Sequence, residues 1–177
     1  MTLDLSQYIR TIPDYPKTGI LFRDITTLIA DGPAFRETID RLAAHCAPLG
    51  VGKIAAIESR GFLFGAPLAA ALGIGFVPIR KPGKLPGMVI SQDYSLEYGQ
   101  DRVEMHVDAT APGEKVVLVD DLIATGGTAL AALSLIRSSG AVVQECLFVV
   151  ELPDLGGRPR IEAEGVPVHS LVRFDGH

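Results

Sequence analysis

Four short apolar runs along the chain have the length and composition of buried β-strands. They occupy residues 53–57 (KIAAI), 76–80 (FVPIR), 115–119 (KVVLV) and 141–151 (AVVQECLFVVE). The third run is the clearest, because it is rich in β-branched residues. Strands that are apolar on both sides are typical of a sheet covered on both faces.

Apolar residues at helical spacing separate these runs and predict three helices. The first begins after Asp31, which is a suitable N-cap. The second covers residues 62–72 and ends at Gly73, although Pro67 would kink it or mark its real start. The third covers residues 128–138. This alternation predicts an α/β fold in which helices flank a mostly parallel sheet.

Residues 82–100 interrupt the alternation, because they hold too many prolines and glycines for a helix. Residues 88–94 and 101–107 alternate loosely and could pair as an antiparallel ribbon. A long polar segment in a compact domain is more often a lid or a binding loop than a connector. We therefore expect a flexible loop at residues 82–100 within a single domain that spans residues 1–177.

The composition is that of an ordinary globular domain, and it narrows the functional classes. Hydrophobic residues make up 47% of the chain and charged residues 21%, with a net charge of −5. An acidic balance argues against nucleic-acid binding, and no apolar run is long enough for a membrane span. Cys46 and Cys146 belong to no His/Cys cluster, so neither disulfides nor a zinc site is expected. With no signal-peptide pattern at the N-terminus, we expect a cytoplasmic protein.

The strongest chemical signal lies where the predicted strand at residues 115–119 ends. The string VVLVDDLIATGGT at residues 116–128 places two acids and a loop of glycines and threonines directly before a helix. Ligands of open α/β sheets bind beyond the carboxyl ends of the strands, and a helix N-terminus favours anions. The loop amides would form a phosphate cradle. Because carboxylates repel phosphate, the acids fit a sugar phosphate whose ring hydroxyls donate hydrogen bonds to them.

Two other phosphate-binding motifs are absent from the sequence. Residues 50–53 (GVGK) lack the spacing and the hydroxyl of GxxxxGK[ST]. Residues 73–75 (GIG) are followed by FVP, so GxGxxG is not completed. The sequence therefore gives no support to an ATPase or a dinucleotide-binding protein.

The string at residues 116–128 resembles the phosphoribosyl-pyrophosphate-binding motif of the type I phosphoribosyltransferases. Four further segments are similar to the adenine phosphoribosyltransferases of that superfamily: residues 19–25 (GILFRDI), 58–62 (ESRGF), 80–87 (RKPGKLPG) and 94–99 (YSLEYG). The resemblance covers residues 8–173. It implies a pentosyltransferase of purine salvage, which joins adenine to phosphoribosyl pyrophosphate and releases AMP and pyrophosphate.

The resemblance also implies which residues bind phosphoribosyl pyrophosphate. The 5-phosphate and the ribose hydroxyls would be bound by Asp120, Asp121, Ala124, Thr125, Gly126, Gly127 and Thr128. The pyrophosphate would be bound by a loop and by nearby cations, namely Glu58, Ser59, Arg60, Gly61, Arg80, Lys81 and Lys84. In the family this loop often holds a non-proline cis peptide, here between Glu58 and Ser59.

Adenine would bind against a small N-terminal hood at residues 1–30. Phe22 would stack on the purine, and Leu122 would pack on its other face. Main-chain groups of Leu21 and Arg23 would recognise its edge. The family also implies a homodimer, with the apolar segments at residues 21–29 and 62–72 as candidate interfaces.

We expect the catalytic groups to be Arg60, Glu97 and Tyr98. Arg60 would stabilise the leaving pyrophosphate as a ribosyl-cation-like state forms. Enzymes that act on 6-oxopurines usually carry an acid at the position of Ala124, so Glu97 is our candidate for proton exchange. Tyr98 would cover the site or align the base. Mg²⁺ would bind through substrate and water, with no direct ligand from the protein.

Two alternatives are open at this point. A phosphoribosyltransferase for hypoxanthine, xanthine or uracil would share the string at residues 116–128, but Ala124 and residues 96–99 (LEYG) count against it. A ligand-sensing regulator could keep the fold without catalysis, but it would need a nucleic-acid-binding element, and the chain has neither spare residues nor a basic patch for one.

Overall fold

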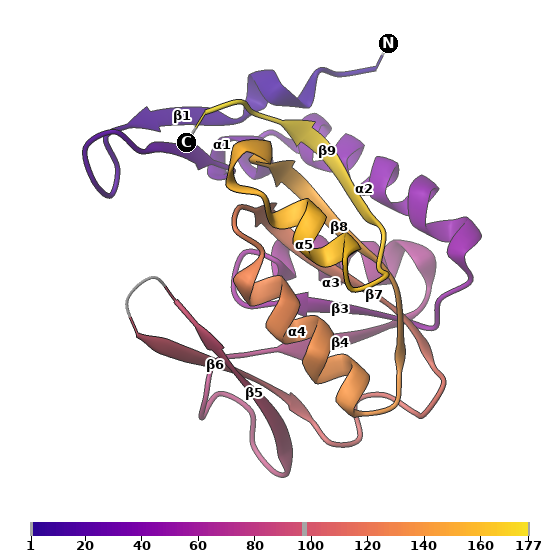
Figure 1. The fold of residues 1–177 in the computed structure, drawn as a ribbon. Coiled ribbons are helices and arrows are strands. Elements are labelled where there is room, and N and C mark those ends of the chain that lie inside the picture. Colours follow the sequence, from indigo (N-terminus) through magenta and orange to yellow (C-terminus); the bar gives the residue numbers. More distant parts are fainter. Residues whose placement is uncertain (1, 97–98, 177) are drawn as a thin grey trace.

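The computed structural model describes residues 2–96 and 99–176, and Figure 1 shows a central sheet with helices on both faces. The sheet has five strands in the order β4-β3-β7-β8-β9. They are β3 (Lys53–Ile57), β4 (Gly75–Ile79), β7 (Lys115–Ile123), β8 (Val142–Glu151) and β9 (Val168–Arg173). Every neighbouring pair is parallel, so the parallel α/β sheet predicted from the sequence is confirmed.

The two faces of the sheet carry separate apolar cores. In β7, Val116 and Leu118 belong to the core on one face, while Val117 and Val119 belong to the core on the other. Successive side chains of a strand point to opposite faces, so a strand buried on both sides needs a continuous apolar run. This explains why residues 115–119 gave such a clear signal.

Two long helices cover one face, and a third covers the other. On the first face lie α2 (Gly32–Cys46) and α3 (Phe62–Leu72), and on the second lies α4 (Gly127–Ser138). The predicted cap of α2 is confirmed, because Asp31 accepts a hydrogen bond from the amide of Ala34 at 2.9 Å. Helix α3 has its predicted length and accommodates Pro67 in its interior.

Shorter elements connect and flank these layers. They are η1 (Leu5–Tyr8), α1 (Thr26–Ala30), η2 (Ala47–Leu49), η3 (Pro153–Leu155) and α5 (Gly157–Glu162). The N-terminal segment shares the core beneath α2 and α3, because Leu5, Ile9, Ile25 and Leu28 are buried in it. The predicted hood at residues 1–30 is therefore packed onto the main body of the fold.

Two antiparallel hairpins stand outside the central sheet. One pairs β1 (Arg10–Pro13) with β2 (Leu21–Asp24), and the other pairs β5 (Val89–Ser95) with β6 (Gln100–His106). The second confirms the predicted ribbon. Residues 82–100 are thus not an open loop throughout, because β5 is paired along its length and contacts α4. Ile90 and Tyr94, which face the core, stabilise this arrangement.

Among the helices of the described residues, none has both the length and the apolar character needed to cross a membrane.

Candidate active site

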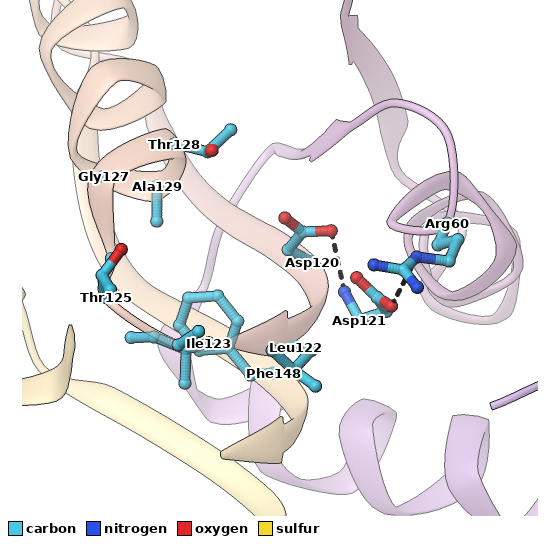
Figure 2. A pocket seen from close by; sticks show the side chains of 12 residues that line it. Arg60, Asp120, Asp121, Leu122, Ile123, Thr125, Gly127, Thr128, Ala129 and Phe148 are labelled. Carbon is cyan, nitrogen blue, oxygen red and sulfur yellow. Dashed lines mark hydrogen bonds and ion pairs between the residues drawn. The ribbon is translucent and has the colours of Figure 1, made fainter. Parts of the chain in front are cut away.

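The carboxyl end of β7 opens into a cavity of about 190 Å³. Its lining comprises Arg60, residues 120–129 and Phe148 (Figure 2). All residues predicted to bind the 5-phosphate and the ribose lie here, together with Leu122 from the predicted adenine site. Residues 58 and 59 and the cations after β4 do not line this cavity.

The loop between β7 and α4 has the geometry of an anion cradle. Gly126 is the N-cap of α4 and has a φ of 81°, a left-handed conformation that side chains rarely adopt. Among the described residues, no side chain caps the first turn of this helix. The first backbone amides of a helix have no partner within it, so those of α4 can donate to a phosphate.

Residue Gly157, at the start of α5, supports the cradle from behind. Its amide donates to the carbonyl of Ala124 at 2.9 Å. A Cβ at this position would lie 2.4 Å from that carbonyl oxygen and 3.0 Å from the nitrogen of Gly126. Only a glycine permits so close an approach. Arg160 adds a second contact, because its Nη1 donates to the carbonyl of Thr125 at 2.5 Å.

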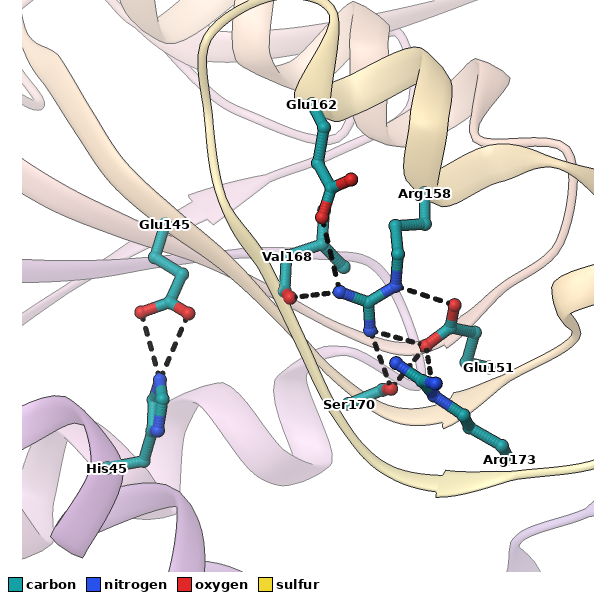
Figure 3. A network of polar contacts seen from close by, with 8 residues as sticks. All are labelled: His45, Glu145, Glu151, Arg158, Glu162, Val168, Ser170 and Arg173. Carbon is teal, nitrogen blue, oxygen red and sulfur yellow. Dashed lines mark hydrogen bonds and ion pairs between the residues drawn. The ribbon is translucent and has the colours of Figure 1, made fainter.

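An ion-pair network around the buried carboxylate of Glu151 links α5 to β8 and β9. The carboxylate of Glu151 accepts hydrogen bonds from Arg158 at 2.8 and 2.6 Å and from Arg173 at 3.2 Å (Figure 3). Ser170 also donates to it. Hydrogen bonds from Arg158, followed by that from Ser170, lower the pKa of Glu151 from 4.5 to about 2 against the opposing effect of burial. Neither the network nor the role of Gly157 was predicted from the sequence.

The two acids at the end of β7 form a compact pair beside Arg60. The amide of Asp121 donates to Oδ1 of Asp120 at 2.8 Å, and Nε of Arg60 lies 2.9 Å from Oδ2 of Asp121 (Figure 2). Burial raises the pKa of Asp120, and the charge of Asp121 raises it further. Hydrogen-bond donors that reach both carboxylates, such as two vicinal hydroxyls of a sugar, would favour the charged form of each acid.

The loop at residues 58–61 follows β3 and reaches the same cavity. The peptide bond between Glu58 and Ser59 is cis, as the family resemblance implied. Gly61 lies against the acids, because a Cβ there would be 2.9 Å from Oδ1 of Asp120 and 2.4 Å from the carbonyl of Ile57. Arg60 is thereby placed at the cavity, where it was predicted to act.

Two of the other predicted cations, Arg80 and Lys81, are paired with carboxylates of the chain itself. Nε of Arg80 lies 3.2 Å from Oε1 of Glu58, which also accepts from the amide of Lys81 at 2.6 Å. The ammonium of Lys81 contacts Asp101 and the hydroxyl of Tyr94. Through Arg80 and Lys81, Glu58 therefore anchors the basic segment at residues 80–84.

Lys84 differs from these cations. Within residues 2–96 and 99–176, its ammonium takes part in no ion pair. Its carbonyl accepts a hydrogen bond from Nη1 of Arg80 at 3.3 Å.

The hood lies close to the cavity through Phe22. The guanidinium of Arg60 is 5.8 Å from the centroid of the Phe22 ring. Arg23 points elsewhere, because its Nη2 donates to the carbonyl of Asp175 at 3.1 Å and its guanidinium lies over Phe174. The Arg23 side chain thus links the hood to the C-terminal segment.

The end of β5 lies close to the cradle. Strand β5 ends at Ser95, whose carbonyl would lie 3.9 Å from a Cβ at Gly127. The amide of Leu96 donates to the carbonyl of Gly99 at 2.9 Å. Glu97 and Tyr98 lie outside the described residues, so their catalytic roles stay predictions.

Comparison with known proteins gives a consistent result. Residues 26–165 match the family model of the phosphoribosyl transferase domain. An adenine phosphoribosyltransferase of Bradyrhizobium sp. (strain ORS 278) is 58% identical over 175 residues, which cover 99% of this chain and 98% of the relative. The crystal structure of the Thermoanaerobacter pseudethanolicus adenine phosphoribosyltransferase has a TM-score of 0.91 and 49% identity, and covers 97% of this chain and 98% of its own.

A structure with bound ligands is also similar. The adenine phosphoribosyltransferase of Saccharomyces cerevisiae, complexed with an imino-altritol bisphosphate and adenine, has a TM-score of 0.91 and 40% identity. The match covers 96% of this chain and 97% of the yeast chain.

Proposed function

The chain belongs to the phosphoribosyltransferase family and, within it, to the adenine phosphoribosyltransferases, and on that premise we propose a role for each part of its site. The enzyme is a pentosyltransferase that transfers the phosphoribosyl group from phosphoribosyl pyrophosphate to adenine, giving AMP and pyrophosphate. The observation that carries the assignment of roles is the cavity at the end of β7, where an amide cradle and two carboxylates lie side by side.

The cradle binds the 5-phosphate, and the acid pair binds the ribose. Amides of residues 125–128 and the hydroxyls of Thr125 and Thr128 donate to the phosphate. Asp120 and Asp121 accept from the ribose hydroxyls, which relieves the repulsion between the two carboxylates. The sugar is then oriented with its anomeric carbon toward Arg60.

The pyrophosphate binds between the 58–61 loop and the basic segment at residues 80–84. Arg60 is released from Asp121 when the ribose hydroxyls take over that carboxylate, and its charge then stabilises the leaving pyrophosphate. Arg80 and Lys81 likewise exchange internal carboxylates for the ligand. Lys84 requires no such exchange.

Adenine binds between Phe22 and Leu122. Phe22 stacks on one face of the ring, and main-chain groups of Leu21 and Arg23 recognise its edge. The engagement of the Arg23 side chain with Asp175 supports a main-chain role for this residue, because the side chain is directed to the C-terminal segment. Glu97 exchanges the proton that adenine loses, and Tyr98 covers the site while water is excluded.

Mg²⁺ fits the acid pair through its hydration shell. Asp120 and Asp121 are adjacent carboxylates, and the pKa of Asp120 is raised. Carboxylate oxygens are groups of the kind that attract a hard cation. Bound Mg²⁺ supplies charge that offsets the pyrophosphate. Asp120 and Asp121 would hold the hydrated ion through its water shell, with no direct ligand from the protein.

We further propose a single-domain, cytoplasmic enzyme that forms a homodimer. A groove of about 620 Å³ between α2 and α3, lined by Phe35, Ile39, Pro67 and Ala70 among others, supports the dimer. Of the two segments expected to form the interface, residues 62–72 contribute Pro67 and Ala70 to this groove, whereas Ile25 and Leu28 of residues 21–29 are buried in the core. Both cysteines are free and buried, which suits a reducing compartment.

The proposed roles are tested by base selectivity and product analysis. The protein is incubated with phosphoribosyl pyrophosphate, Mg²⁺ and one purine base at a time, and the product is identified by mass. We expect AMP from adenine to form fastest. Equal rates with hypoxanthine or guanine would contradict the proposed base site at Leu21, Phe22 and Arg23.

A further inference from the structure

Three side chains that are distant in sequence converge on the α2 face of the sheet. His45 lies near the end of α2, Glu145 lies on β8 and His169 lies on β9. Leu147 pairs with His169 across the two strands, so Glu145 is a diagonal neighbour of His169 on the same face. One ligand atom from each residue lies within 4.8 Å of the other two.

The contacts within this cluster are close. Nε2 of His45 is 3.0 Å from both carboxylate oxygens of Glu145 (Figure 3). The rings of His45 and His169 are stacked, with centroids 3.7 Å apart and planes inclined by 9°. The Glu145 side chain is only 10% exposed. A buried carboxylate and two imidazoles are thus held within the reach of one ion.

The polar atoms of the cluster have few other partners. In the described part of the chain, His45 is the only side chain that makes a hydrogen bond with the Glu145 carboxylate. The ring nitrogens of His169 have no hydrogen-bond partner among those same residues. Buried carboxylates are usually paired or coordinated more fully than this. The cluster therefore retains capacity to bind a ligand.

We propose that His45, Glu145 and His169 form a binding site for a divalent transition metal such as Zn²⁺. Two imidazoles and one carboxylate are a ligand set typical of zinc, with water completing the coordination. Mg²⁺ would not compete well, because it prefers an all-oxygen shell. The sequence gave no sign of the site, because no two of its ligands are close in the chain.

Metal binding requires a small rearrangement of the stacked rings. The lone pairs of an imidazole lie in the ring plane, so two parallel rings cannot direct their nitrogens at one ion. Tilting one ring about its side-chain torsions corrects this. His45 has the freedom to tilt, because its side chain is 33% exposed. The parallel stack is thus the metal-free arrangement of the site.

The site is separate from the substrate cavity. Phe148, which lines that cavity, belongs to the core on the α4 face, whereas Leu147, which neighbours the cluster, belongs to the core on the α2 face. Bound metal would join α2 to β8 and β9 and so stabilise the fold. We expect no change in the chemistry of phosphoribosyl transfer.

The test is titration of the metal-free enzyme with Zn²⁺ by isothermal calorimetry. We expect one ion per chain, and loss of that ion in His169→Ala and in Glu145→Gln. His106→Ala is the matched control, because His106 contacts the carbonyl of Pro86 at 2.7 Å and lies outside the cluster. Any weak binding by Asp120 and Asp121 is common to all variants and cancels in the comparison.

A second measurement keeps the proposal testable if a variant folds poorly. Zn²⁺ at about 100 times its Kd should raise the Tm of the unmodified enzyme by about 5–10 °C. Co²⁺ bound at the site should give visible absorption bands that Zn²⁺ abolishes. The proposal would be overturned if the unmodified enzyme and both cluster variants bound Zn²⁺ equally. It would also be overturned if none of them bound Zn²⁺.

Discussion

The phosphate cradle and the basic side chains around it are prepared for an anion in different ways. The cradle is built from backbone, and its amides at the start of α4 are left without a capping side chain. Arg60, Arg80 and Lys81 instead form ion pairs with carboxylates of the same chain. One anion site is ready before substrate arrives, and the other has to exchange partners.

The difference suggests an order of events. With the roles proposed above, the 5-phosphate would bind without displacing a protein group, whereas the pyrophosphate would compete with Asp121, Glu58 and Asp101 for its cations. Pairing the cations internally also prevents an acidic protein from exposing a strongly basic pocket to other anions. The 5-phosphate should therefore contribute most to initial binding, and the cations most to the transition state.

The largest effect is expected for Glu97, the candidate for proton exchange. Glu97→Gln keeps the size of the side chain but removes the titrating group. We expect kcat to fall roughly 10²–10⁴-fold with little change in substrate affinity, because a positioned proton acceptor is lost. Single-turnover kinetics would measure this. A near-normal rate of the chemical step would assign the proton to another group or to water.

A second variant tests whether the cradle depends on its support. Gly157→Ala introduces a Cβ that would lie 2.4 Å from the carbonyl of Ala124. We expect kcat/KM for phosphoribosyl pyrophosphate to fall roughly 10²-fold, since small misplacements of a binding group are costly. Gly32→Ala is the control, because the space around Gly32 is open. Equal kinetics in the two variants would show that the loop is insensitive to α5.

The acid pair should show a somewhat smaller effect. Asp120→Asn and Asp121→Asn each remove a charged acceptor, and such hydrogen bonds contribute about 1.5–3 kcal/mol. This corresponds to a loss of about 10- to 150-fold in kcat/KM for phosphoribosyl pyrophosphate. Thermal unfolding checks that the fold is retained. Unchanged kinetics in both variants would remove the ribose role from this pair.

The scaffold behind the cradle should be sensitive to acid. The folded-state pKa of Glu151 is lowered from 4.5 to about 2, so its stabilising contribution is complete above pH 4.5. It is lost as the pH falls from 4.5 towards 2. We expect the free energy of unfolding to decline over that window, and to decline less in Glu151→Gln. Parallel pH profiles of the two proteins would contradict this.

The smallest effect on kinetics is expected from a variant that removes one of the internal ion-pair partners of the cations. Asp101→Asn removes a carboxylate that competes for Lys81. Because partly exposed ion pairs contribute at most about 1 kcal/mol, we expect KM for phosphoribosyl pyrophosphate to fall by no more than about five-fold, most clearly at low salt. Asp93→Asn is the matched control, since it breaks only the pair with Arg102. An unchanged or raised KM in Asp101→Asn would argue against internal competition.

The parts of the fold that could be predicted are those with local signals. The string at residues 116–128 predicted a strand, a cradle and a helix start, because each depends on neighbouring residues. The ribbon was also predictable, since residues 88–94 and 101–107 alternate. Strands β1, β2 and β9 were missed, because short strands with mixed polar and apolar residues resemble loops.

The parts that could not be predicted depend on contacts between distant segments. Nothing near Gly157 in the sequence indicates that it lies against Gly126. The ion pairs of Arg80 and Lys81 were likewise hidden, since Glu58 and Asp101 are remote from them in the chain. The family resemblance implied which residues would bind substrate, but it did not reveal the internal contacts that hold them.

The contact between Gly126 and Gly157 also has a consequence for synthesis of the enzyme. The cradle segment leaves the ribosome well before the residue that supports it, and β8 must form between the two. A nascent or prematurely terminated chain that stops before α5 therefore has the complete phosphate-binding string without its supporting glycine. We expect such fragments to bind no phosphoribosyl pyrophosphate, so the metabolite would stabilise finished chains only.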